Sequence, residues 1–518
     1  MRKLTAGVRR PLLAVAAFAL LGGCRELAAD TPPIPSAAGG YDVRAFGAKG
    51  NGVTVDGPAI DRAISAAAAV GGGTVRFGAG TYLSGSIHLK SNISLFLDQG
   101  ATLVASSPGD GGQYDPPEEN AAAGKYQDFG HTHWHNSLIW GEGLENVSIL
   151  GPGRLWGKGL VRDDGGPDGR GNKAISLKLC RNVTIRDVTI QHGGWFGILA
   201  TGVDNLTIDN LKIDTNRDGM DIDCCRNVHV SNCSVNSPND DGICLKSSYG
   251  LGFARATENV TITNCGVSGF DEGTFLACTY GRATHAGTGR IKFGTESNGG
   301  FQNITISNCV FTYCNGLALE TVDGGLLEDV SISNITMRDI TGAPLFLRLG
   351  SRLRGPAGTK VGALRRVNIS SVVVYNADPR YAAILSGIPG HPLEDVTLSN
   401  IQIWVRGGGP KAQAATKPPE REAAYPEPTM FGAMPSYGFF LRHVRGITLE
   451  NIGLHTLAED LRPAFALEDV ADADLDRVRA SHAPDVPVFA LTNVTDLRVH
   501  QTDGVPDVQK DRVEQGTL

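Results

Sequence analysis

Apolar and polar residues alternate in a short phrase that recurs ten times along the chain. The phrase reads Asn/Asp-Val-Thr-Ile-x-Asn-x-x-Ile, and the positions one and three residues after its start are apolar in every copy. Short runs of period two, broken by Asn and Gly, indicate β-strands rather than helices. The copies start at Asn146, Asn182, Asn205, Asn227, Asn259, Asn303, Asp329, Arg366, Asp395 and Gly446.

The spacing of the copies predicts a solenoid. The shortest spacings are 22 and 23 residues, which suits three short strands and their corners. Five residues into the phrase, seven copies carry an asparagine, which tolerates a left-handed turn and can bond to its counterpart one coil away. We expect an all-β, single-stranded, right-handed parallel β-helix over residues 39–510, because a sandwich or propeller would need hairpin turns that are not evident. The expected ladder consists of Asn210, Asn232, Asn264, Asn308, Asn334, Asn400 and Asn451.

Two segments outside the repeats have their own patterns. Residues 56–70 are alanine-rich and predict a capping helix, which would protect the open edge of the solenoid, and a strand follows at 74–77. Residues 410–435 are rich in Pro, Ala and Glu and have no strand period. We interpret this second segment as a long excursion, either a lid over one end of a groove or a disordered loop.

The N-terminus predicts export. A basic start and an apolar run at 12–21, too short to span a membrane, form a signal peptide over residues 1–24. It ends in Leu21-Gly22-Gly23-Cys24, which resembles the bacterial lipobox, whose cysteine is lipidated. We expect a protein of the periplasm, or one anchored in the outer membrane through Cys24, with residues 25–38 as a tether. Cleavage near Ala28 is the alternative, and a monomer is expected.

Composition narrows the choice of partners. The net charge of −7 gives no electrostatic case for nucleic acid. Cysteines recur at one core position of the phrase, as Cys233, Cys265 and Cys309, where they act as small hydrophobes. Cys309 and Cys314 are the closest pair in sequence for a disulfide, and the cysteines lack the spacing of a metal site. The cysteines therefore give no sign of a metal or a cofactor.

Three aspartates give the repeat a candidate chemistry. Asp218 lies thirteen residues past Asn205, and Asp240, followed by Asp241, lies thirteen past Asn227. Adjacent coils are about 4.8 Å apart, so the three acids should meet and at least one pKa should rise. A protonated acid beside a base is what glycosidic bond cleavage needs. A Ca²⁺ site and a solvated turn remain open as alternatives.

The motifs around these acids carry a resemblance. Asn216-Arg217-Asp218-Gly219-Met220-Asp221, followed by Asn239-Asp240-Asp241-Gly242, resembles glycoside hydrolase family 28, the polygalacturonase family, over roughly residues 40–455. The resemblance implies that Asp240 is the general acid and that Asp218 and Asp241 activate water. It further implies inversion, no metal, Asn216 at the substrate, and pectin, an acidic plant polysaccharide, as the substrate. A Ca²⁺-dependent pectate lyase and a non-catalytic polysaccharide-binding β-helix are the alternatives.

Two later motifs of the family depart from its pattern. The Gly-His-Gly histidine falls on Asp271-Glu272 or on residues 287–289, depending on the direction of counting. The Arg-x-Lys position reads Ala318-Leu319-Glu320, whereas Arg290-Ile291-Lys292 spells that motif one coil early, as a displaced clamp or by accident. Because a missing clamp suits a rhamnose, we favour rhamnogalacturonan slightly over polygalacturonate. The sequence leaves endo and exo action open.

Several further residues are candidates for substrate binding. Lys246 could hold a uronate or be an exposed lysine, and Trp195 could stack on a sugar or belong to an aromatic core. Glu272, Arg290 and Lys292 complete the predicted binding set. A loop with three histidines is expected to form a groove wall rather than a metal site, and an arginine strip suits an acidic polymer or a solvated face. The loop residues are His131, His133, Trp134 and His135, and the strip residues are Arg348, Arg352 and Arg354.

Overall fold

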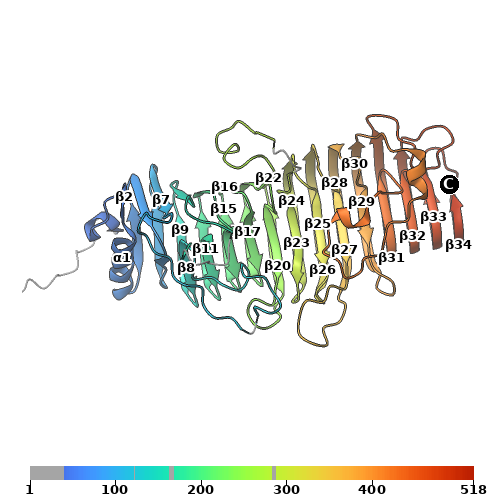
Figure 1. Cartoon of the computed structure of the whole chain (residues 1–518). Helices are drawn as coiled ribbons and strands as arrows, with labels where there is room; N and C mark the ends of the chain where they lie inside the picture. The colour runs from blue at the N-terminus through green and yellow to red at the C-terminus, as the bar shows by residue number, and fades with distance from the viewer. Residues whose placement is uncertain (1–39, 122, 163–168, 283–286) are drawn as a thin grey trace, which may run out of the picture. The chain divides into compact units, whose positions relative to one another are not determined.

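The computed structural model describes residues 40–121, 123–162, 169–282 and 287–518. The predicted signal peptide, the tether and Cys24 lie outside these residues. The described strands follow one another in chain order as stacked parallel coils (Figure 1). This arrangement confirms the predicted parallel β-helix.

Sheet 1 is the face of the solenoid that carries the predicted acids. Its strands pair in parallel, each with the strand one coil on, as Met220 of β17 does with Ile243 of β20. The strands are β5 (Ile87–His88), β8 (Ile139–Glu142), β11 (Lys173–Lys178), β14 (Phe196–Thr201), β17 (Asp218–Asp223), β20 (Ile243–Ser247), β23 (Ile291–Ser297), β25 (Leu317–Thr321), β27 (Leu345–Leu349), β29 (Ala383–Ser386), and the first residues of β31 (Phe439–Thr456), β32 (Phe465–Ala480) and β33 (Phe489–His500).

Sheets 2 and 3 complete each coil. Sheet 2 contains β1 (Gly40–Asp42), β3 (Gly73–Phe77), β6 (Ile93–Leu97), β9 (Glu145–Leu150), β12 (Arg181–Arg186), β15 (Asp204–Asp209), β18 (Arg226–Ser231) and β21 (Thr257–Thr263). Sheet 3 contains β2 (Asn51–Val55), β4 (Gly80–Ser84), β7 (Ala101–Ala105), β10 (Arg154–Trp156), β13 (Thr189–Gln191), β16 (Lys212–Asp214), β19 (Ser234–Asn236) and β22 (Gly266–Ser268). Later coils join both sheets in single long strands, which are β24 (Phe301–Thr312), β26 (Leu326–Arg338), β28 (Ala363–Ala377), β30 (Leu393–Val405) and the remainders of β31, β32 and β33.

The solenoid ends differently on its two sides. Helix α1 (Gly57–Ala69) buries Ile60, Ala63 and Ile64 against the first coils, which confirms the predicted cap. At the other end, β34 (Val508–Thr517) pairs antiparallel with β33. Three short 3₁₀ helices, η1 (Val43–Phe46), η2 (Lys411–Ala415) and η3 (Pro428–Phe431), complete the elements. No helix among the described residues is long and apolar enough to cross a membrane.

The repeated phrase builds the core and a corner. Its apolar positions are buried, as Val228 and Val230 show at 0% exposed. Over the copies from Asn146 to Asn303, the asparagine that starts the phrase has a positive φ and forms a continuous ladder, in which Asn227 donates to Asn205 at 3.2 Å and accepts from Asn259 at 3.0 Å. The ladder that the sequence predicted five residues later is less regular. Its asparagines also have positive φ, but the carboxylate of Asp209 accepts from Asn232, so that chain of amides is interrupted.

The cysteines in the described part of the chain are free thiols. Cys233, Cys265 and Cys309 lie buried on successive coils, as predicted for a core ladder. The suggested disulfide between Cys309 and Cys314 is absent, because each sulfur faces backbone carbonyls instead.

Candidate active site

The structure brings the three predicted aspartates together on the outer face of sheet 1. Asp218 starts β17, while Asp240 and Asp241 precede β20, and one carboxylate oxygen of each lies within 4.8 Å of the others. Gly219 N donates to Asp241 O at 3.0 Å, so Asp241 rather than Asp240 is level with Asp218. The reason is that the turn from β19 to β20 is one residue longer than the turn from β16 to β17.

The three carboxyls have different environments. Asp218 is 4% exposed, and burial together with the charge of Asp240 raises its pKa well above the ordinary value. Burial would also raise the pKa of Asp241, but Lys292 and Arg290 outweigh it and the pKa of Asp241 is lowered. Asp240 is the most accessible, with 24% of its side chain exposed, and it pairs with Arg217. The expected rise of at least one pKa in the cluster is therefore confirmed.

Arg290 and Lys292 lie against this cluster although they come one coil before the family's position. Arg290 Nε donates to Asp241 Oδ1 at 2.8 Å, and Lys292 Nζ lies 3.4 Å from Asp241 Oδ2. Both side chains are 2% exposed. The displaced motif is thus a cation pair that is buried beside the acids.

Two glutamates complete the surroundings of the cation pair. Glu320, level with Arg348 of the next coil, lies 3.5 Å from Lys292 and is fully buried, so that burial raises its pKa to about 8. Glu427 comes from far along the chain and accepts from both terminal nitrogens of Arg290, at 2.5 and 3.3 Å. Nothing in the local sequence around Glu427 signals this contact.

A histidine reaches the site from an unexpected direction. His131 is buried, with Nε2 3.0 Å from Asp221 Oδ2 and Nδ1 2.6 Å from Asp128 Oδ1. Burial would lower its pKa, but the charge of Asp128 outweighs burial and the pKa is raised. The predicted groove-wall loop thus places a histidine 3.0 Å from Asp221, three residues past Asp218.

Lys246 is not an exposed lysine. Its Nζ lies 2.9 Å from Glu296 Oε2 and 3.9 Å from Asp221 Oδ2, and the residue is 5% exposed. The lysine therefore already has carboxylate partners beside the acids. The sequence made Lys246 a candidate because it lies five residues after Asp241, but it did not identify Glu296 or Asp221 as partners.

The other predicted binding residues have partners outside the three acids. Asn216 accepts from the amide of Asn239, and Glu272 pairs with His192 Nδ1 at 2.7 Å. Trp195 is 6% exposed and packs with Phe129 in an aromatic cluster, while Arg162 lies over its ring at 5.2 Å. This placement corresponds to the aromatic-core alternative.

The three arginines of the predicted strip do not form an open basic surface. Arg348 is 1% exposed and donates to backbone carbonyls of residues 420 and 421. Arg352 pairs with Asp323, and Arg354 pairs with Glu296 at 2.5 Å. The three arginines instead form hydrogen bonds and ion pairs with neighbouring residues of the fold.

Loops cover sheet 1 on both sides of the acids. Residues 123–136, the early loop, pack on Phe196 and Leu199 of β14, and Trp134 Nε1 donates to Thr201 Oγ1 at 3.1 Å. Residues 407–438, the late loop, cover the coils beyond the site. Their apolar contacts join Met430, Phe431 and Met434 to Ala318, Phe346, Ile384 and Phe440. The acids on β17 and before β20 therefore lie between two covered stretches of the same face.

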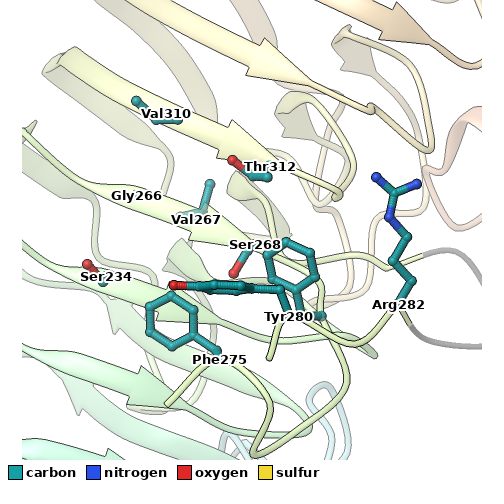
Figure 2. Close-up of a pocket in the computed structure, with 10 residues that line it drawn as sticks. Ser234, Gly266, Val267, Ser268, Phe275, Tyr280, Arg282, Val310 and Thr312 are labelled. Carbon is teal, nitrogen blue, oxygen red and sulfur yellow. The ribbon is translucent and has the colours of Figure 1, made fainter. Parts of the chain in front are cut away.

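A pocket of about 500 Å³ lies elsewhere, on the outer side of β19, β22 and β24. Figure 2 shows Phe275 and Tyr280 of the insertion at 270–282 beside Ser234, Ser268 and Thr312. Its lining residues include no carboxylate. The pocket offers no acid–base pair, so the aspartate cluster remains the candidate active site.

The aspartate cluster could in principle hold a cation, since three carboxylate oxygens converge. Arg217, Arg290 and Lys292 already supply positive charge to Asp240 and Asp241, however. A divalent cation would be repelled by these groups at close range. The donor set therefore fits proton transfer better than metal binding.

Comparisons with known proteins agree with this geometry. Residues 168–285 match a family model described as a right handed beta helix region, and residues 41–114 match one described as rhamnogalacturonase A/epimerase, pectate lyase-like. A probable polygalacturonase of Vitis vinifera is 24% identical over 76% of this chain and 80% of its own length. A polygalacturonase of Cochliobolus carbonum is 24% identical over 54% of this chain and 67% of its own.

Two solved structures share the fold. A hyperthermoactive exopolygalacturonase from Thermotoga maritima superposes with a TM-score of 0.61 at 20% identity, covering 82% of this chain and 93% of that one. A family 28 exopolygalacturonase of Yersinia enterocolitica also gives a TM-score of 0.61, at 19% identity, covering 90% of this chain and 79% of that one.

Proposed function

The chain belongs to glycoside hydrolase family 28, the polygalacturonase family, and we propose that it hydrolyses the α-glycosidic bonds of polygalacturonate in the pectin backbone. The observation that carries the proposal is the cluster of Asp218, Asp240 and Asp241 on one face of the β-helix, with oxygens within 4.8 Å of one another. One carboxyl of the cluster has a raised pKa and another a lowered pKa. The cluster therefore holds a carboxyl that favours its proton beside one that favours its charge, and acid–base cleavage of a glycosidic bond needs both forms.

The accessibility of the three acids supports a division of roles. Asp240 is the most exposed and can reach the oxygen of the leaving sugar, so we assign it as proton donor. Asp241, which Lys292 and Arg290 keep ionised, and Asp218 beside it would orient and deprotonate the attacking water. Because the three groups are coupled, the proton that burial places on Asp218 in the free enzyme belongs to the cluster and can redistribute when a sugar binds.

Polygalacturonate replaces rhamnogalacturonan as the preferred substrate. The sequence favoured rhamnogalacturonan because the Arg-x-Lys position was empty of cations. In the structure Arg290 and Lys292 lie against the acids. The cations are therefore present, and their absence is no longer an argument for rhamnogalacturonan. The rhamnogalacturonase-like match covers residues 41–114, ahead of the coils that carry the acids.

The stereochemical outcome remains a proposal. The resemblance implies inversion, for which carboxyl groups are usually about 6.5–9.5 Å apart. Here the nearest oxygens lie within 4.8 Å, so a water would have to sit beside the cluster, against Asp218 and Asp241, rather than between distant carboxyls. Proton NMR of the first product would show the β-anomer for inversion, whereas an initial α-anomer would contradict it.

The covered flanks of sheet 1 favour attack at a chain end. The early loop packs on β14 and reaches β17 through His131, and the late loop covers β25, β27, β29 and β31 and reaches Arg290, beside β23, through Glu427. A long polymer could not lie along the whole face. We therefore propose exo action, in which mono- or disaccharides appear from the start of the reaction, whereas a ladder of intermediate oligomers would indicate endo action.

Release of reducing ends tests the main proposal. The protein is incubated with polygalacturonate and, separately, with rhamnogalacturonan, with a chelator present. New reducing ends from polygalacturonate, without absorbance from an unsaturated product, support hydrolysis. Chelator-sensitive formation of unsaturated products would favour a lyase, and binding without any release would favour a non-catalytic role. Asp240→Asn serves as the inactive control.

Export and lipidation at Cys24 are a separate proposal, supported by the basic and apolar pattern of residues 1–24. Expression in a bacterial host with labelled palmitate, followed by membrane fractionation, tests it. Label on the wild type and none on Cys24→Ser would support lipidation. An unlabelled wild type would leave a signal peptide cleaved further on.

A further inference from the structure

The late loop places a carboxylate on the cation pair of the site. Glu427 Oε1 and Oε2 accept from Arg290 Nη2 and Nη1 at 2.5 and 3.3 Å, and Lys292 Nζ lies 3.7 Å from Oε1. Arg290 uses its remaining Nε for Asp241. Glu427 therefore occupies the two-pronged side of the guanidinium, which is the side that recognises carboxylates most specifically.

We propose that Glu427 is a specificity-determining residue that occupies, in the free enzyme, the position in which Arg290 and Lys292 bind a carboxylate of the substrate. A uronate of the polysaccharide binds there by exchanging with Glu427. This inference rests on the proposed function, because it assumes that the ligand is an acidic sugar chain.

The charge balance of the site supports an exchange of one carboxylate for another. Arg290 and Lys292 carry two positive charges, and Asp241 and Glu427 carry two negative charges. Burial raises the pKa of Glu320 to about 8, so this fifth group is mainly neutral at pH 7. Replacing Glu427 with one uronate leaves the sum unchanged, whereas adding a uronate beside Glu427 would put an unpaired negative charge into a buried site.

The anchoring of the late loop allows the side chain to move alone. Glu427 directly precedes η3, and Met430 and Phe431 of that turn are buried against sheet 1. The side chain of Glu427 remains 29% exposed, in contrast to the 2% of Arg290. Rotation of the Glu427 side chain can therefore expose Arg290 and Lys292 to solvent while the loop backbone stays in place.

The ring of Tyr425 fits the same site. Tyr425 is 53% exposed, and Lys292 Nζ lies 5.4 Å from its ring centre. An exposed aromatic face beside a carboxylate-binding cation pair suits a sugar that carries a carboxylate, because the ring can pack on its C–H groups. The late loop thus offers both the competing carboxylate and a surface for the sugar.

The test compares Glu427→Gln with a matched control, Glu422→Gln. Glu422 lies on the same loop and is exposed, and the contact that fixes residue 422 is its backbone oxygen, which accepts from Ser351 N. Both changes remove one negative charge from the loop. KM and kcat are measured on polygalacturonate and on the same polymer with its carboxylates methyl-esterified.

We expect Glu427→Gln to lower KM on polygalacturonate about tenfold, the scale of one charge-assisted hydrogen bond that no longer competes. The esterified polymer should show no such gain, and Glu422→Gln should match the wild type on both. An unchanged or raised KM on polygalacturonate would overturn the proposal. An equal loss of kcat on both polymers would also overturn it, because Glu427 would then be a fixed counter-ion.

Binding measurements separate this inference from the proposed function. Calorimetric titration with oligogalacturonate uses Asp240→Asn, with and without Glu427→Gln. Tighter binding with Glu427→Gln supports the exchange even if the wild type cleaves no pectin, and equal binding refutes it even if the wild type cleaves. Glu427→Asp, which withdraws the carboxylate by one methylene, should give an intermediate gain and guards against misfolding of the glutamine variant.

Discussion

Replacing Arg290 with methionine tests whether the acid cluster depends on its buried cations. The guanidinium is 2% exposed and donates three hydrogen bonds to two carboxylates, one to Asp241 and two to Glu427. Without Arg290, Lys292 is the cation that remains close to Asp241, at 3.4 Å. Removing one partner of a buried ion pair costs about 3–5 kcal/mol, because the other charge is left uncompensated. We expect a loss of that size in the free energy of unfolding at pH 7.

The loss should depend on pH with a definite sign. In the wild type, burial would raise the pKa of Asp241, but Lys292 and Arg290 outweigh it and lower the pKa. A carboxyl whose pKa is lowered by folding stabilises the fold above its unfolded pKa and loses that contribution as the pH falls through its folded pKa. Removing Arg290 raises the folded pKa of Asp241. The difference between the variant and the wild type should therefore begin to shrink as the pH falls through the folded pKa of Asp241 in the variant, and it should vanish only below the folded pKa of the wild type, under about 4.

Scanning calorimetry at pH 7 and pH 4 measures the effect. With an unfolding entropy of about 1 kcal/mol/K for a chain of this size, the expected loss lowers Tm by about 3–5 °C at pH 7. Arg365→Met is the matched control, since Arg365 is 36% exposed and pairs with Glu328 at 2.8 Å. Because Arg365 is partly exposed and Arg366 also pairs with Glu328, the loss of this pair should cost about 0–1 kcal/mol. A Tm loss for Arg290→Met no larger than that of the control, or equal at both pH values, would refute the reasoning.

Three further changes probe the site and the fold. Asp240→Asn should lower kcat by about 10²–10⁴-fold with an unchanged circular dichroism spectrum, since it removes the proposed proton donor; activity within tenfold of the wild type would contradict that role. Burial raises the pKa of Glu320 to about 8, so the folded state holds a proton that the unfolded state loses, and Tm falls as the pH rises from 5 to 8. Glu320→Gln should flatten this fall, which corresponds to about 3–5 kcal/mol in the free energy of unfolding. Equal slopes by calorimetry would show that Glu320 is not protonated. Asn227→Ala should cost about 1–3 kcal/mol in urea unfolding, because Asn227 makes two ladder hydrogen bonds at φ 55°, and a loss below 0.5 kcal/mol (roughly the scatter of surface changes) would contradict it.

The fold could be predicted because each coil repeats the same physical requirements. Val228 and Val230 must face the core, and the asparagine at the start of the phrase must adopt a left-handed conformation at the corner. Both requirements can be seen in the sequence, as apolar residues and asparagines at fixed positions of the phrase. The ladder predicted five residues into the phrase is confirmed in part, since Asn264 donates to Asn232 and Asn334 donates to Asn308. It is interrupted where Asp209 accepts from the amide of Asn232, which the sequence does not show.

The site could be predicted only where it follows the coil. Asp218, Asp240 and Asp241 were found by counting residues from the phrase, although the longer turn before β20 shifted the register by one. His131 and Glu427 reach the cluster from 90 and 137 residues away from their partners. Loop residues of this kind carry no periodic signal, because their positions depend on the tertiary packing of the loops.

The displaced cation pair changes the acids as well as the substrate contacts. Lys292 is level with Ala318, the first residue at the family's usual position for the pair, and is therefore about 4.8 Å nearer to the coil of Asp241 than a lysine on β25 would be. From there it lies 3.4 Å from Asp241 and 3.5 Å from Glu320. Glu320, which stands at the family's lysine position, thus lies beside Lys292, and Lys292 has direct control over the pKa of Asp241.

This control predicts the acid limit of activity. Burial alone would raise the pKa of Asp241, and Lys292 is the strongest of the groups that lower it. The profile of kcat/KM against pH reports the pKa values of the free enzyme, so Lys292→Met should move the acid limb to higher pH. The pH at which the acid limb lies does not depend on the absolute rate, so it can be measured even if the variant is slower. An acid limb that stays in place or moves to lower pH would mean that Asp241 is not the base, and that the proton is removed from the attacking water by Asp218.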